Sequence, residues 1–88
     1  MTDPTALTTL TEDRARALVV DVLRGIAPGP ELDGLRPEDD LRETLGLDSL
    51  DFRNLVVGVS ERAGRRIEED DYEGLADLAG WIRLLAGP

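Results

Sequence analysis

Three stretches of the chain carry apolar residues at helical spacing. They cover residues 11–26, 49–63 and 77–86. Because residues three and four apart lie on one face of a helix, each stretch predicts an amphipathic helix with one buried side. The apolar positions on these faces are Ala15, Leu18, Val19, Val22, Leu23 and Ile26, then Phe52, Leu55, Val56, Val59 and Ala63, then Leu78, Trp81, Ile82 and Leu85.

Polar residues and glycines mark the ends of the three helices. Thr11, Asp48 and Asp77 are placed to cap the helix starts, because their side chains accept hydrogen bonds from free N–H groups of the first turn. Gly64 is placed to end the second helix. Gly80 falls inside the third helix, where glycine costs about 1 kcal/mol relative to alanine.

The segments between the helices contain turn-forming residues. Residues 27–37 include three prolines and two glycines, which exclude a long helix and predict a long ordered loop. Residues 40–46 predict a further helical turn that ends at Gly46, with Leu41, Leu45 and Leu47 holding the loop. After the second helix, Ile67 is expected as a buried anchor, and residues 69–74 predict one short helical turn.

The pattern therefore predicts an all-α fold, a small bundle of three to four helices with a long first loop. A single domain is expected over residues 11–86, with a flexible N-terminus over residues 1–10. The chain has 88 residues, of which 41% are hydrophobic, with one Trp, one Tyr and one Phe. This composition assigns the core to Leu, Val, Ile and Ala, residues that suit packed helices.

The charge of the chain limits its partners. Nineteen acidic residues against ten arginines give a net charge of −9, which repels nucleic acid and anionic membranes and attracts basic protein surfaces. A small, strongly charged domain is also expected to be a monomer. Since no secretion signal or long apolar run is visible, we expect a cytoplasmic protein that does not enter the membrane.

The chain lacks the residues that most catalytic and metal sites require. It contains no Cys, His or Lys, so a nucleophilic serine would have only carboxylates as a base, which argues against a hydrolase. The acidic run at residues 68–71 does not have the ligand spacing of a calcium loop and is expected to be a solvated turn. We therefore predict no catalytic residue and no metal ligand.

One motif is specific enough to indicate a function. The segment Gly46-Leu47-Asp48-Ser49-Leu50 places a serine at a helix start after a long loop. It resembles the phosphopantetheine attachment motif of acyl carrier proteins, and the resemblance extends over about residues 11–86. The resemblance implies a non-catalytic carrier in which Ser49 bears 4′-phosphopantetheine from coenzyme A. Free N–H groups at a helix start suit the phosphodiester of this arm.

The resemblance also implies a docking surface for partner enzymes along the second helix. A helical wheel places four residues outward, and two acidic residues stand at the helix start; together the candidate docking residues are Asp48, Leu50, Asp51, Asn54, Val57 and Glu61.

Asn54 and Ser60 occupy positions where the family often has acids. Arg53 stands where the family usually has an aliphatic residue, and its stem is expected to cover the edge of the core while the guanidinium reaches solvent or an acid. These departures suggest a specialised pathway.

The partners follow from the same resemblance. They are a phosphopantetheinyl transferase, a ligase or transferase that loads the acyl or aminoacyl group, and synthase or transferase enzymes of fatty-acid, polyketide or related biosynthesis. Two alternatives remain open: a peptidyl or aminoacyl carrier, and a helical interaction module without a cofactor. The enzyme that loads the arm distinguishes the first alternative, and the effect of Ser49→Ala distinguishes the second.

Overall fold

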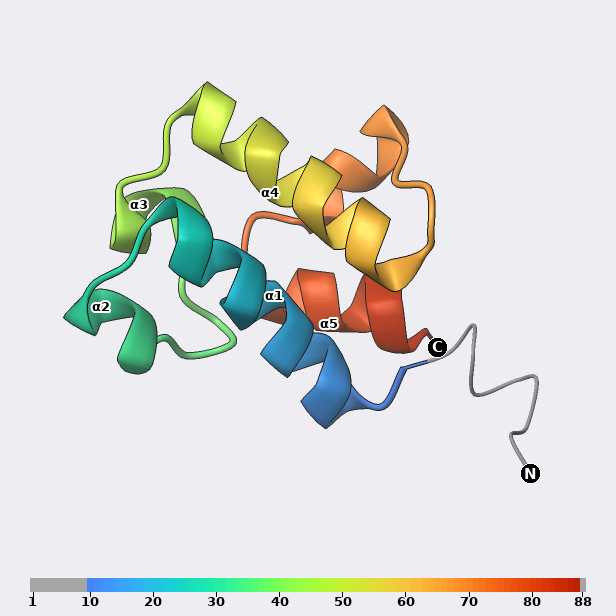
Figure 1. Cartoon of the computed structure of the whole chain (residues 1–88), viewed down its shortest axis with the longest axis horizontal. Coiled ribbons are helices and arrows are strands. Elements are labelled where there is room, and N and C mark those ends of the chain that lie inside the picture. The colour runs from blue at the N-terminus through green and yellow to red at the C-terminus, as the bar shows by residue number, and fades with distance from the viewer. Residues whose placement is uncertain (1–9, 88) are drawn as a thin grey trace.

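The fold is a small bundle of helices (Figure 1), here described from a computed structural model for residues 10–87. The elements are α1 (Glu12–Ile26), α2 (Pro30–Asp33), α3 (Leu41–Leu45), α4 (Ser49–Ala63), the 3₁₀ helix η2 (Glu69–Gly74) and α5 (Leu78–Ala86). The all-α class is confirmed. The flexible N-terminus predicted for residues 1–10 lies outside the described residues except for Leu10, which is half-buried against the core.

The predicted caps define the helix boundaries. The Thr11 hydroxyl oxygen accepts a hydrogen bond from the Arg14 N–H at 3.1 Å, and the Asp77 carboxylate accepts one from the Gly80 N–H at 2.8 Å. Gly64 ends α4 in the left-handed conformation, with φ of 63°. Each cap satisfies backbone groups that the helix itself leaves unpaired, so these boundaries are encoded locally.

The first loop contains a helical turn that the sequence did not predict. Pro30 begins α2 at the first helical position, where a fixed φ and a missing N–H are tolerated. Leu32 and Leu35 are both buried and fix this segment to the core. The prolines therefore exclude a long helix, as predicted, but one of them starts a short helix.

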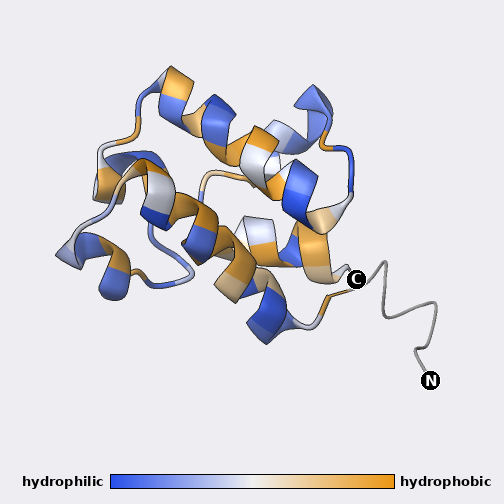
Figure 2. Cartoon of the chain, viewed as in Figure 1, coloured by the Kyte–Doolittle hydropathy of each residue, from blue (hydrophilic) through white to orange (hydrophobic). Residues whose placement is uncertain are grey.

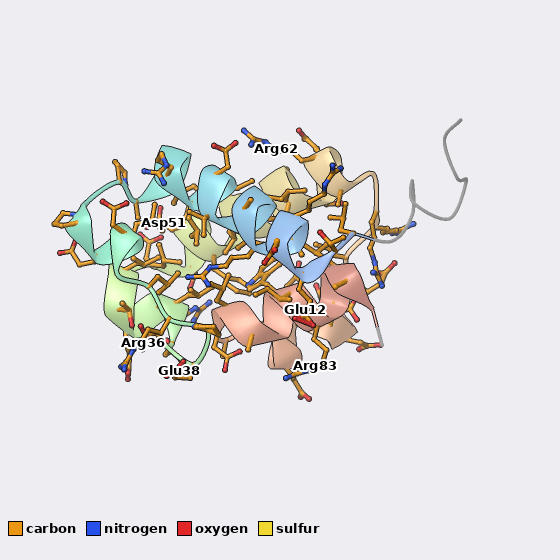
Figure 3. All side chains as sticks on the ribbon, turned by 90° about the horizontal axis from the view of Figure 1, so that it is seen from below. Glu12, Arg36, Glu38, Asp51, Arg62 and Arg83 are labelled. Carbon is orange, nitrogen blue, oxygen red and sulfur yellow. The ribbon has the colours of Figure 1, made fainter. Side chains whose placement is uncertain are left out.

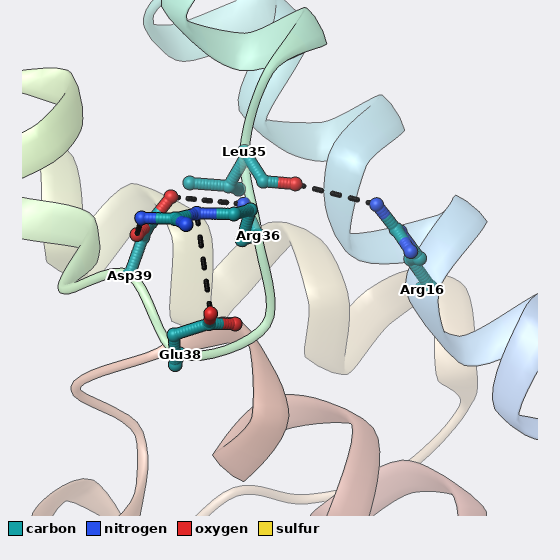
Figure 4. A network of polar contacts seen from close by, with 5 residues as sticks. All are labelled: Arg16, Leu35, Arg36, Glu38 and Asp39. Carbon is teal, nitrogen blue, oxygen red and sulfur yellow. Dashed lines mark hydrogen bonds and ion pairs between the residues drawn. The ribbon is translucent and has the colours of Figure 1, made fainter.

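Polar contacts hold the rest of this loop in place (Figure 4). Arg16 on α1 donates to the carbonyl oxygen of Leu35 at 3.3 Å. The Arg36 N–H donates to the Asp39 carboxylate at 2.9 Å, and the Arg36 guanidinium lies 4.0 Å from a Glu38 carboxylate oxygen. The loop thus approaches α3 along a defined path.

Two backbone hydrogen bonds then join the end of this loop to the start of α5. The Leu41 N–H donates to the Ala76 carbonyl at 2.9 Å, and the Ala79 N–H donates to the Pro37 carbonyl at 2.9 Å. These bonds join segments about forty residues apart in the sequence. They fix the start of α3 against the start of α5.

The core lies between α1, α4 and α5. α1 packs against both other long helices, and the apolar faces of the helices turn inward in Figure 2. Trp81 is 0% exposed and is the largest fully buried side chain. By contrast, Ile26, Ile67 and Ile82 are only half-buried. The buried position of Trp81 agrees with its place on the apolar face predicted for residues 77–86, and Leu, Val and Ala15 supply the rest of the core as expected. The expectation for isoleucine is wrong: Ile67 is an edge residue rather than a buried anchor.

Gly80 has a structural role that the sequence prediction missed. A Cβ at this position would overlap the carbonyl oxygen of Gly74 and lie 2.8 Å from its carbonyl carbon. Backbone atoms cannot move aside as a flexible side chain can. The close approach of η2 to α5 therefore requires glycine here, a role that its low helix propensity does not reveal.

We expect Gly80→Ala to destabilise the fold by about 1–3 kcal/mol, the usual cost of overpacking, despite the better helix propensity of alanine. Gly25 provides the matched control, because it lies in α1 where an added Cβ would meet nothing within 4 Å. Gly25→Ala should instead stabilise by roughly 0.5–1 kcal/mol. Urea unfolding followed by circular dichroism measures both, and a stabilised Gly80→Ala variant would contradict the close approach.

None of the helices in residues 10–87 has both the length and the apolar composition needed to cross a membrane.

Candidate functional site

Ser49 is the first residue of α4 and its side chain is exposed. The preceding helix α3 ends at Gly46, which adopts the left-handed conformation with φ of 69°. Leu47 then returns to the core at 6% exposure. The turn thus reverses the chain, anchors it with one leucine and leaves the serine hydroxyl open to solvent at the start of a long helix.

Asp48 and Asp51 form a reciprocal capping box around Ser49. The Asp48 carboxylate accepts the Asp51 N–H at 2.8 Å, and the Asp51 carboxylate accepts the Asp48 N–H at 3.4 Å. The capping role predicted for Asp48 is confirmed, and the reciprocal role of Asp51 is new. Within residues 10–87, the N–H groups of Ser49 and Leu50 are left without an acceptor, which suits an anion on the Ser49 oxygen.

We expect Asp48→Ala to destabilise the protein by about 0.5–2 kcal/mol, the range for loss of an N-cap. Asp48→Asn is the matched control, because asparagine caps helices about as well as aspartate. Chemical denaturation separates the two variants, and amide exchange at Asp51, whose N–H the Asp48 carboxylate accepts, reports loss of the cap. Equal losses in both variants would show that the charge, and not the cap, stabilises this turn.

A cleft of about 740 Å³ opens beside Ser49. Three elements build it: the end of the first loop with α3, the first turns of α4, and η2 with the residues after it. The lining residues are Asp40, Leu41, Arg42, Ser49, Phe52, Arg53, Glu69, Tyr72, Glu73, Leu75 and Ala76. The serine that the sequence singled out therefore stands at the rim of a cavity.

Aromatic side chains form the floor of the cleft. Phe52 is half-buried and meets the Tyr72 ring edge to face, with ring centroids 5.6 Å apart and planes at 81°. Its centroid also lies 6.4 Å from that of Trp81. The Arg42 guanidinium carbon lies 5.0 Å from the Phe52 centroid, within the range of a cation–π contact. The cleft therefore combines an apolar floor with charged side chains of both signs at its sides.

The predicted docking residues occupy the outer surface of α4. Leu50 is 64% exposed and Val57 is 46% exposed, and Asn54 and Glu61 are exposed on the same side of the helix. At the helix start, Asp48 is exposed and Asp51 is half-buried in the capping box. The predicted outward orientation of the four wheel residues is confirmed, while their role in docking stays a prediction.

Arg53 is exposed and lines the cleft together with Ser49. It forms no ion pair with any of the described residues. Of the two surroundings expected for its guanidinium, solvent or an acid, the exposed position agrees with solvent.

The arginines at the far end of α4 are engaged in structural contacts. Arg62 pairs with Asp21 on α1, and Arg65 donates to the carbonyl oxygen of Leu84 on α5. Arg66 lies 2.9 Å from a Glu68 carboxylate oxygen. Figure 3 shows Arg62 on the outside of the bundle. Arg62 and Arg65 thus connect this end of α4 to α1 and α5, and Arg66 pairs within the loop that follows α4.

Sequence reasoning missed most of the cleft. Four of its lining residues come from α3 and η2, namely Arg42, Glu69, Tyr72 and Glu73. No spacing along the chain relates them to Ser49. The aromatic residue at position 72 was the one visible signal, since a Tyr in an acidic turn has little local reason to be there. Within residues 10–87, acidic side chains do not gather into a group suited to hold a metal ion.

Comparison with known proteins identifies similar chains. Residues 13–85 match the family described as "Phosphopantetheine attachment site". An acyl carrier protein of Chlamydia trachomatis is 31% identical over 74 residues, which cover 84% of this chain and 90% of that protein. One of Saccharopolyspora erythraea is 40% identical over 47 residues, 53% of this chain and 50% of that protein. No solved structure matches significantly.

Proposed function

The chain belongs to the acyl carrier protein family, whose members are non-catalytic carriers with a 4′-phosphopantetheine group, and from this premise we propose that Ser49 bears the arm. The observation that carries the proposal is the exposed serine at the start of α4, inside the matched region, with free N–H groups and a cleft beside it. These features fit a phosphodiester on the serine oxygen. When bound, the arm supplies a thiol that holds cargo as a thioester.

Ser49 depends on a transferase for this modification. The chain contains no His or Lys, and the Asp48 and Asp51 carboxylates are occupied in the capping box. A hydroxyl without an adjacent base is a weak nucleophile. A phosphopantetheinyl transferase must therefore take the proton as the Ser49 oxygen bonds to the pantetheine-bearing phosphorus of coenzyme A. The pyrophosphate bond breaks, and adenosine 3′,5′-bisphosphate leaves.

The proposed cargo is an acyl group of fatty-acid, polyketide or related biosynthesis. The relatives are named acyl carrier proteins, which favours acyl over aminoacyl cargo. The exposed stripe of Leu50, Asn54, Val57 and Glu61 supports transient docking of loading and synthase enzymes on α4, with Asp48 and Asp51 at its upper end. Weak, electrostatically steered contacts suit a carrier that visits several partners.

Loading followed by peptide mapping tests the site. The purified protein is incubated with coenzyme A and a broad-specificity transferase, and its intact mass is expected to rise by one phosphopantetheine. Trypsin cleaves after Arg42 and Arg53, so the arm should appear on the peptide of residues 43–53, which contains Ser49 as its one serine. If the folded protein gains no mass, even with the transferase of its own organism, the remaining interpretation is a helical interaction module without a cofactor.

The loading enzyme then tests the cargo class. The pantetheinylated protein is offered to a fatty-acid malonyl transferase and, separately, to adenylating enzymes with amino acids. Malonyl loading supports the acyl proposal. Loading only by an adenylating enzyme would support the peptidyl or aminoacyl alternative. If the enzymes of fatty-acid synthesis all accept the loaded protein efficiently in place of their usual carrier, a specialised pathway would be contradicted.

A further inference from the structure

Two arginines flank Ser49 on the side of the cleft. Arg53 follows Ser49 by one helical turn on α4, so both residues lie on nearly the same face. Side chains in a helix lean toward its N-terminus, which directs the Arg53 stem over the turn that contains Ser49. Arg42 faces the same space from α3, with its guanidinium carbon 5.0 Å from the Phe52 ring centroid.

The charge of these two arginines is not balanced by ion pairs with the described residues. Four other arginines form an ion pair with a carboxylate, namely Arg24, Arg36, Arg62 and Arg66. Arg42 and Arg53 form no ion pair with the described residues. Three acids also line the cleft. Among them, Asp40 accepts the Glu43 N–H as the cap of α3 at 3.0 Å, and Glu69 and Glu73 stand on η2 without an ion pair to the described residues.

We propose that Arg53, with Arg42, binds the phosphodiester of the arm attached to Ser49. This inference rests on the proposed function. The phosphorus would be bonded to the Ser49 oxygen, which places the two non-bridging oxygens next to the cleft that both arginines line. A guanidinium presents paired N–H donors that match two phosphate oxygens, and charge-assisted bonds of this kind are about twice as strong as neutral ones.

The contact would set the direction in which the arm leaves the protein. With its phosphate held at the cleft, the arm starts toward Phe52 and Tyr72, away from the exposed Leu50 and Val57 side chains. The two guanidiniums also offset the repulsion between the phosphodiester and the Asp48 and Asp51 carboxylates. Arg53 and Arg42 act here as binding and positioning residues for the arm, and the docking surface on α4 stays clear for partner enzymes.

Nuclear magnetic resonance of the loaded protein tests the contact without an activity assay. In the wild type, the side-chain Nε–H signals of Arg53 and Arg42 should shift on conversion from the apo to the loaded form. The ³¹P signal should differ from that of the loaded peptide of residues 43–53, which carries the same phosphodiester outside the fold. It should move toward the signal of that peptide in Arg53→Gln, while Arg53→Lys keeps part of the difference. Raising the salt to about 1 M, where the Debye length is about 3 Å, should also reduce it.

Arg83→Gln is the matched control, because Arg83 is an exposed arginine without an ion pair to the described residues and does not line the cleft. Its ³¹P signal should equal that of the wild type. Intact mass and circular dichroism verify that each variant is loaded and folded. A loaded, folded Arg53→Gln variant with an unchanged ³¹P signal, together with unshifted arginine signals in the wild type, would overturn this inference alone. A wild type that accepts no arm would overturn the proposed function and this inference with it.

Discussion

Ser49→Ala is expected to abolish phosphopantetheine attachment completely. The substitution removes the only oxygen on that side chain, and alanine offers no atom to which the phosphorus can bond. The fold should persist, because Ser49 is exposed and the Asp48–Asp51 capping box stabilises the first turn of α4 without its hydroxyl. Intact mass after incubation with coenzyme A and transferase measures the effect, and circular dichroism verifies folding.

Ser60→Ala is the control for this experiment. Ser49 and Ser60 are the only serines in the chain, and both lie on α4. Ser60 donates to the Arg65 carbonyl oxygen at 2.5 Å at the far end of the helix, so its loss should affect only that end. Ser60→Ala should gain the full mass increment. Attachment to a folded Ser49→Ala protein would move the site to another hydroxyl and refute the assignment.

Trp81→Ala is expected to cause the largest loss of stability among core substitutions. Trp81 is fully buried, and its indole N–H donates to the Leu75 carbonyl oxygen at 3.1 Å. Trp→Ala substitutions in cores cost about 3–5 kcal/mol. A chain of 88 residues has a total stability of roughly 4–13 kcal/mol at the usual value per residue. Trp81→Ala should therefore be marginally folded or unfolded at 25 °C.

Urea unfolding followed by circular dichroism at 222 nm is the appropriate measurement, because Trp81 is the only tryptophan and its removal also removes the fluorescence signal. Trp81→Phe should cost less, since it keeps most of the buried ring but leaves the Leu75 carbonyl without its donor. Leu50→Ala, at an exposed position, should stay within about 0.5 kcal/mol of the wild type. A Trp81→Ala variant close to the wild type in stability would show that the bundle is not built around this residue.

The loss of Trp81 should alter the cleft beside Ser49 as well as the core. Its ring lies beside Phe52, which forms the floor of the cleft with Tyr72. The apolar side of the cleft is thus an extension of the core, and the position of η2 beside α4 depends on it. We expect core variants that remain folded to alter the environment of the arm even though they do not touch Ser49.

The sequence by itself determined the three long helices, their ends and the candidate serine. Helix boundaries depend on interactions between residues three or four apart, such as the Thr11 and Asp77 caps, and such contacts are visible in the chain order. The inward face of α4 followed from the same periodicity. The family resemblance was also a property of local sequence, because its motif occupies five consecutive residues ending at Leu50.

Only the tertiary structure decided how distant segments meet. It brought Arg42 from α3 and Tyr72 from η2 to the side of Ser49, and it changed Gly80 from a weak helix residue into one required by the Gly74 backbone. Helix propensity counts only the intrinsic cost of a residue, whereas packing adds the atoms of every segment folded against it. For that reason the sequence indicates where the arm is attached, and the packed bundle decides what surrounds it.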